Sequence, residues 1–220
     1  MKPGAKKICH LKSDRIDEQC LHRAAHIIRR GGVVVFPTHG LYGLGANALD
    51  GDALERVLRL KRRDRGKPLL SLVADMSALE QVARRPEGAA RFLMQCLWPG
   101  GVTFVVAAGD KAHDSLTGGG GKIGVRIPGH PVAAALARAA GVPITGTSAN
   151  LSGAGGCADI KALAPDLIHG ADLILDAGPL AGGPGSTVVD ICGSVPQVLR
   201  EGRISEKQIM QCQRLYLRGR

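Results

Sequence analysis

Aromatic residues are scarce in this chain of 220 residues. Phe, Tyr and Trp together make up only 3% of it, so its core must be built mainly from Val, Leu, Ile and Ala. So few rings also argue against a nucleic-acid surface made of stacked aromatic side chains. The 31 glycines show no collagen period, and we expect them to mark tight turns and close backbone approaches.

The cysteines lack the spacing of a metal site. No CxxC pair and no matching histidine spacing is present, as a zinc site would require. The same scatter is a poor framework for disulfide bonds in a chain of this size. We therefore expect no metal site and only reduced, buried or incidental thiols. The six cysteines are Cys9, Cys20, Cys96, Cys157, Cys192 and Cys212.

Signals for export or membrane insertion are also missing. Residues 1–15 are basic but lack the apolar stretch of a secretory signal. The uncharged run 92–109 is split by Trp98, Pro99 and two glycines, so it does not read as a membrane span. We expect a soluble cytoplasmic protein that has no membrane partner.

Helix-like and strand-like apolar patterns alternate along the chain, which predicts an α/β fold. No break in composition marks a boundary, so we expect one domain over residues 1–220. Helical patterns occupy residues 16–30, 53–62, 77–83, 87–97, 132–140 and 205–217. Strand patterns occupy residues 33–36, 69–73, 102–107, 123–127, 144–147, 173–175, 187–191 and 197–199.

The formal net charge of +10 indicates a polyanionic partner or substrate. The excess is concentrated at the two ends and in residues 56–67, whereas residues 31–55 contain no Lys or Arg. The densest cluster, from Lys61 to Lys67, suits a triphosphate, because Arg supplies bidentate donors and Lys a point charge. The alternative is a solvated basic surface.

Two glycine-rich segments resemble nucleotide motifs only superficially. Gly43-x-Gly45-x-x-Ala48 lacks the acidic residue at the end of a following strand that a dinucleotide site needs. We interpret it as a strand that runs into a loop, with Thr38 lining a pocket. Residues 118–121 with Lys122 lack the first glycine and the Ser or Thr of a phosphate loop, so we reject that motif too.

A run of small polar side chains, residues 145–153, follows a buried type of strand. Such strand ends hold ligands in open α/β sheets, although a polar loop that caps a helix would look the same. His39 and His130 lie near these motifs. Each is either a proton carrier or a hydrogen-bonded structural or ligand-contact group.

Seven short motifs occur in one order across most of the chain. Together they closely resemble the YrdC-like family, the bacterial threonylcarbamoyl-AMP synthases, over about residues 16–204. The motifs lie at residues 37–45, 61–69, 98–103, 125–131, 147–153, 186–190 and 199–202.

The resemblance implies a twisted open α/β sheet flanked by helices, with a positively charged concave cavity. It implies that L-threonine, bicarbonate and ATP are joined into threonylcarbamoyl-AMP and pyrophosphate, with Mg²⁺ assisting. The product would pass to a tRNA-modifying threonylcarbamoyl transferase complex.

The resemblance also assigns roles to individual residues. The catalytic set is Lys61, Arg63, Ser148 and Asn150. The ATP contacts are Arg63, Lys67, Lys122, Ser148 and Arg200. The threonine and carbamate contacts are Thr38, Arg126, Ser148 and Ser186.

One departure from the family pattern leaves the amino-acid specificity open. Family members usually read Pro-Thr-acid-Thr where this chain has His39 and Gly40 after Pro37 and Thr38. The second Thr contacts threonine in the family, and losing a hydroxyl contact weakens discrimination. The alternatives are an enzyme for another amino acid or carbamoyl compound and a non-catalytic binder of double-stranded RNA or ribosomes. The basic termini could also contact tRNA directly.

Overall fold

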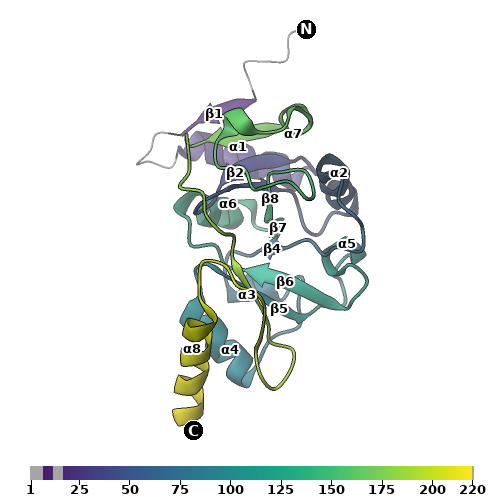
Figure 1. Ribbon diagram of the computed structural model, residues 1–220. Helices are drawn as coiled ribbons and strands as arrows, with labels where there is room; N and C mark the ends of the chain where they lie inside the picture. The colour runs from purple at the N-terminus through teal and green to yellow at the C-terminus, as the bar shows by residue number, and fades with distance from the viewer. Residues whose placement is uncertain (1–6, 12–16, 220) are drawn as a thin grey trace.

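The computed structural model describes residues 7–11 and 17–219 (Figure 1). Helices surround two open β-sheets, so the predicted α/β class is confirmed, with the strands divided between two sheets. Within the described ranges, no helix is long and apolar enough to cross a membrane.

The first sheet has the strand order β1-β9-β2-β3-β8. Strands β1, β9 and β2 run parallel, and β2, β3 and β8 continue the sheet in antiparallel fashion. The strands are β1 (Ile8–His10), β9 (Leu173–Asp176), β2 (Val34–Pro37), β3 (Tyr42–Gly45) and β8 (Thr147–Ser148).

The second sheet has the order β11-β10-β5-β6-β4-β7. The chain passes from β7 to β8, and so between the sheets, through the single residue Gly146. It crosses back through residues 177–186, which we call the strap, between β9 and β10. The strands are β11 (Gln197–Arg200), β10 (Thr187–Asp190), β5 (Val102–Ala107), β6 (Lys122–Arg126), β4 (Ser71–Leu72) and β7 (Ile144–Thr145).

Both faces of the central strand β2 of the first sheet are buried. Because side chains alternate along a strand, Val34 and Phe36 join one core with helices α1 and α6, while Val33 and Val35 join the other core. At the far end of the molecule, α8 lies beside α4 (Figure 1). The helices are α1 (Glu18–Arg29), α2 (Gly51–Lys61), α3 (Met76–Leu79), α4 (Gly88–Leu97), α5 (Asp114–Thr117), α6 (Pro131–Ala140), α7 (Pro165–Gly170), α8 (Glu206–Arg218) and the 3₁₀ helix η1 (Ile160–Ala162).

The predicted loop after β2 is limited to residues 38–41, where Thr38 lines a cavity, whereas the glycine-rich part Tyr42–Gly45 was wrongly included in it and is a strand. β3 pairs with β2 over its whole length, with Gly43 opposite Phe36. A Cβ atom would lie 3.1 Å from the Phe36 ring at Gly43 and 2.8 Å from it at Gly45. These glycines therefore make room for a buried ring.

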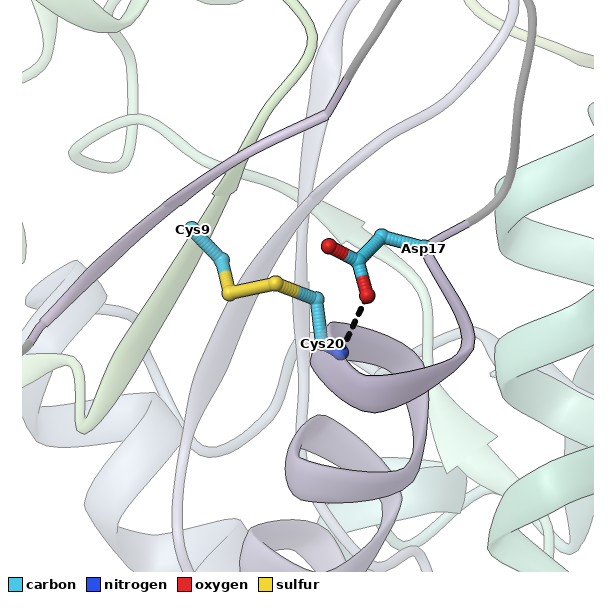
Figure 2. The surroundings of a disulfide bond; sticks show 3 residues. All are labelled: Cys9, Asp17 and Cys20. Carbon is cyan, nitrogen blue, oxygen red and sulfur yellow. Dashed lines mark hydrogen bonds between the residues drawn. A yellow bond between two sulfur atoms is a disulfide. The ribbon is translucent and has the colours of Figure 1, made fainter.

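The expectation of reduced thiols was wrong for Cys9 and Cys20, which form a disulfide (Figure 2). Cys9 lies on β1 and Cys20 in the first turn of α1, and their Cα atoms are 6.1 Å apart. The Asp17 carboxylate accepts a hydrogen bond from the Cys20 backbone and caps the helix there. The fold brings these two elements together, which the spacing of the cysteines could not show. Cys96, Cys157, Cys192 and Cys212 are free.

Two predicted helices are clearly longer than the elements that the structure shows. The pattern over residues 16–30 becomes α1, which begins at Glu18, and Ile16 lies outside the described residues. The pattern over residues 77–83 yields only the short α3, which ends at Leu79.

Candidate active site between the two sheets

The buried ammonium of Lys61 holds the polar segment that follows β7. Lys61 is only 2% exposed. Its Nζ donates to the backbone oxygen of Ser148, to the Asn150 backbone oxygen at 2.8 Å and to Asn150 Oδ1 at 3.2 Å. All three ammonium protons therefore have an acceptor in residues 148–150, and Lys61 positions that segment.

Burial, reinforced by the nearby Arg63 guanidinium, lowers the pKa of Lys61 to about 8. The end of α2 explains why Lys61 points inward. Arg62 adopts the left-handed conformation there, with φ 50°, and the Arg63 amide bonds back to Leu58 O at 2.9 Å. The chain turns at this point, which separates buried Lys61 from the residues that follow.

Ser148 and Asn150 form one hydrogen-bonded pair. The Ser148 hydroxyl donates to Asn150 Oδ1, and Asn150 Nδ2 donates to the Leu151 and Ala154 carbonyls. The Asn150 side chain is thereby fixed on both ends, with its amide oxygen also facing Lys61.

Arg63 and Lys67 lie on the turn after α2. The Arg63 guanidinium donates to the Lys67 carbonyl at 3.2 Å and to the Pro68 carbonyl at 3.0 Å, and burial lowers the pKa of Arg63. Lys67 is exposed, and its ammonium forms no hydrogen bond or ion pair in the described part of the chain. Lys67 is thus the more accessible cation on this turn.

A second group of predicted residues lines a cavity of about 30 Å³ beside the strap. Ser186 is 6% exposed, and its hydroxyl shares a 2.7 Å hydrogen bond with Thr103. Arg200 donates to the Ser186 carbonyl at 2.8 Å. The predicted residues that line this cavity are Thr38, Arg126 and Ser186.

Arg126 has an unsatisfied donor in this cavity. Its Nε is buried without a hydrogen-bond partner, and burial, with a smaller effect of Arg200, lowers the pKa of Arg126 to about 10. Arg126 therefore stays charged at neutral pH. A buried guanidinium nitrogen without a partner is costly in a protein interior, and a bound anion would satisfy it.

His39 and His130 meet edge to face, with ring centroids 5.8 Å apart. Burial, followed by the charges of Arg203 and Arg126, lowers the pKa of His39. Burial, followed by His39, lowers the pKa of His130 to about 4. At neutral pH both rings are therefore uncharged, and the cations of this cavity are arginines.

Neighbouring strands connect the two groups of residues. Gly43 pairs with Ser148 across β3 and β8, and a Cβ at Gly43 would lie 3.4 Å from the Thr38 side chain. The Thr38 hydroxyl donates to the Leu41 carbonyl within its own turn. The predicted threonine contact and the segment held by Lys61 thus lie on either side of one glycine.

Lys122 lies apart from both groups. It begins β6, whereas Arg126 ends it, and its ammonium forms an ion pair with Asp190 at 2.7 Å. Two hollows of about 490 and 540 Å³ open elsewhere, beside Arg84 and beside Arg59. Neither contains a residue that the sequence assigned to the site.

Arg203 also lines the cavity, and the sequence analysis missed it. The only available signal was its position directly after the 199–202 motif. Within the ranges that the structure describes, no group of three or more His, Cys, Asp or Glu side chains could hold a metal ion.

Comparisons with known proteins show the family to which this chain belongs. The sequence model named Sua5/YciO/YrdC, described as telomere recombination, matches residues 26–202. Threonylcarbamoyl-AMP synthase of Bacillus subtilis is 38% identical over 188 residues, which are 85% of this chain and 54% of the relative. This chain therefore spans about half the length of that relative, and 58% of a second one from Pyrococcus abyssi.

Solved structures agree with these matches. P. abyssi Sua5 complexed with L-threonine superimposes with a TM-score of 0.88 at 34% identity, over 93% of this chain and 60% of that one. E. coli YciO superimposes with a TM-score of 0.83 at 30% identity, over 93% of this chain and 100% of that one. The resemblance inferred from the seven motifs is confirmed, and the chain belongs to the Sua5/YciO/YrdC family.

Proposed function

We propose that this protein is a threonylcarbamoyl-AMP synthase that acts on L-threonine, bicarbonate and ATP. The observation that carries the proposal is the cavity beside the strap, which is lined by Ser186 and by Arg126, whose Nε is buried without a hydrogen-bond partner. A guanidinium and a hydroxyl suit a carboxylate. The related P. abyssi structure, which contains L-threonine, supports the same assignment.

The proposed reaction depends on the alignment of two anions rather than on a nucleophile from the protein. The threonine amine and bicarbonate give a carbamate and water. A carbamate oxygen then bonds to the α-phosphorus of ATP, while the bond from that phosphorus to the bridging oxygen breaks and pyrophosphate leaves. Two anions must approach each other, so fixed cations and hydrogen-bond donors supply the main catalytic effect.

Individual residues have distinct parts in this scheme. Arg126 and Ser186 hold the carboxylate of threonine, and Thr38 lies beside them. Arg63, Lys67 and Arg200 neutralise the triphosphate. Ser148 and Asn150 align the reacting oxygens, while Lys61 keeps their segment in place. Lys122 contacts ATP only if its ion pair with Asp190 opens.

Mg²⁺ would enter with the nucleotide. Magnesium typically keeps several waters and binds substrate phosphates with few protein carboxylates. The described residues offer no cluster of metal-binding side chains, so this site fits a metal carried by triphosphate oxygens. When bound, the ion neutralises phosphate charge.

The product is an activated acyl adenylate, which a separate transferase complex would use to modify tRNA. We also propose that the protein works in the cytoplasm. Its basic termini would contact tRNA or double-stranded RNA directly. RNA affinity would fall steeply as salt concentration rises.

The test is pyrophosphate release from ATP and bicarbonate with L-threonine, with L-serine or with no amino acid. Threonine-dependent release, together with threonylcarbamoyl-AMP detected by mass spectrometry, is the expected result. Well-folded protein that shows no threonine-dependent release would refute the proposal. Preferential turnover of another amino acid would instead identify a relative with a different substrate.

A further inference from the structure

The backbone around Arg203 is fixed on the strap and the start of β10. The Arg203 amide donates to the Gly185 carbonyl at 3.1 Å. The amides on either side, of Gly202 and Ile204, both donate to the Thr187 hydroxyl at 3.0 Å. Residue 203 is therefore held in one place, so the direction of its side chain is defined by the fold.

Two glycines make a path for that side chain. A Cβ at Gly101 would lie 3.3 Å from the Arg203 Cβ and 3.9 Å from its Cδ. A Cβ at Gly40 would lie 3.3 Å from the Arg203 Nη1. The side chain thus runs past Gly101 and ends beside Gly40, where it lines the same cavity as Arg126.

The strap closes the same space from another side. The Gly182 amide donates to the Gly40 carbonyl at 2.9 Å, and a Cβ at Gly40 would lie 2.1 Å from the Gly182 oxygen. No side chain fits at residue 40 in this arrangement. The Arg203 guanidinium therefore lies beside a residue that has no side chain of its own.

The positive charge in the cavity has no counterion within the described chain. Arg126 and Arg203, which line the cavity, form no ion pair with any described carboxylate, and neither does Arg200. The facing His39 stays neutral at pH 7, because burial, then Arg203 and Arg126, lower its pKa. Two arginines that line one cavity and have no carboxylate partner suit a planar anion that both guanidinium groups can contact.

We propose that Arg203 is a second carboxylate-binding residue of this cavity and acts opposite Arg126. The proposal rests on the proposed function. The ligand is a group with two oxygens on one carbon, either the α-carboxylate of the amino acid or the carbamate derived from bicarbonate. Arg203 is exposed and lines this cavity, so its guanidinium can contact a ligand that enters from solvent.

The kinetic test compares Arg203→Ala and Arg203→Lys with the wild type. Arg203→Ala is expected to raise KM for L-threonine or for bicarbonate about tenfold or more, the loss expected for a charge-assisted hydrogen bond. The substrate whose KM rises identifies the carboxylate that Arg203 contacts. KM for ATP should change less than about twofold, and Arg203→Lys should recover part of the loss.

The matched control is Arg85→Ala, which removes an exposed arginine that pairs with Glu80. This control should leave every KM unchanged. Melting temperatures of all variants should stay near that of the wild type, since Arg203 is exposed and its backbone makes the structural contacts. Unchanged KM values for both threonine and bicarbonate in Arg203→Ala would overturn the inference and leave the proposed function standing.

A binding measurement separates the two proposals. The melting temperature is titrated with L-threonine and with bicarbonate in the absence of ATP, so no turnover is needed. Stabilisation that Arg203→Ala weakens would support the Arg203 assignment even if wild-type protein releases no pyrophosphate. Failure of both probes to stabilise the wild type would count against Arg203 as a carboxylate-binding residue.

Discussion

The Nζ atom of Lys61 lies 2.8 Å from the backbone oxygen of Asn150, in a side chain that is only 2% exposed. The end of helix α2 is thereby tied to the segment that carries Ser148 and Asn150. A charged donor buried among oxygens stabilises their arrangement as long as all of them remain paired. We therefore expect Lys61 to matter for stability as well as for activity.

Lys61→Ala should therefore lower both turnover and stability. The substitution removes the lysine donor from two backbone carbonyls and from the Asn150 side-chain oxygen, which keeps its hydrogen bond from the Ser148 hydroxyl. An unsatisfied buried group costs about 1–3 kcal/mol. Urea unfolding should show a loss of roughly 2–4 kcal/mol in total, and pyrophosphate release should fall sharply. Lys67→Ala, at an exposed position of the same basic cluster, should leave stability unchanged. Wild-type stability of Lys61→Ala would contradict the positioning role.

The pH dependence of the free energy of unfolding should reveal the lowered pKa of Lys61. Its pKa in the folded protein is about 8, below the ordinary lysine value of 10.5. A lysine whose pKa is lowered by folding opposes folding while it is charged, and this penalty is relieved as pH rises from about 8 toward 10.5. The wild type should therefore gain about 2 kcal/mol relative to Lys61→Met between pH 7.5 and 9.5. Parallel stability curves for the two proteins would show that the Lys61 pKa is not lowered.

The sequence located the two polar segments of the site but not their contacts. The cluster from Lys61 to Lys67 and the run after β7 stood out because charge and small polar side chains are local properties of a chain. That Lys61 turns inward depends on the left-handed Arg62 at the end of α2, and no propensity predicts that conformation for arginine. The structure thus divides one basic cluster into a buried and an exposed part.

Pairings between distant segments were equally hidden. Gly43 and Gly45 looked like a ligand-binding turn, whereas their role depends on Phe36 in the adjacent strand. Likewise, Arg203 reaches the cavity only because Gly40 and Gly101, far away in sequence, leave it room. Alternating helices and strands gave the α/β class, but the division into two sheets depends on the crossings at Gly146 and the strap.

Reduction of the Cys9–Cys20 disulfide should destabilise the protein without changing its chemistry. The bond closes a loop with a sequence separation of 11 residues, which corresponds to about 3 kcal/mol in the chain-entropy model. Urea unfolding with and without a reductant, and of Cys20→Ser, should show a loss of that order. The exposed free thiol Cys192 supplies the control, because Cys192→Ser should leave unfolding unchanged. Identical unfolding of oxidised and reduced protein would contradict a stabilising bond.

Gly40→Thr, which introduces the residue that family members usually carry, should impair the enzyme. A Cβ at this position would lie 2.1 Å from the Gly182 oxygen, so the strap must move before the side chain can fit. Overpacking of this kind costs about 1–3 kcal/mol, and a displaced strap carries Gly185 and Ser186 away from Arg203 and Arg200. Turnover and threonine affinity should both fall, as measured by pyrophosphate release.

Gly155→Ala, at a glycine with no atom within 4 Å of a new Cβ, is the matched control and should behave as wild type. Tighter threonine binding by Gly40→Thr would instead show that the hydroxyl can be restored, and that the close contact between Gly40 and the strap does not set the shape of the cavity.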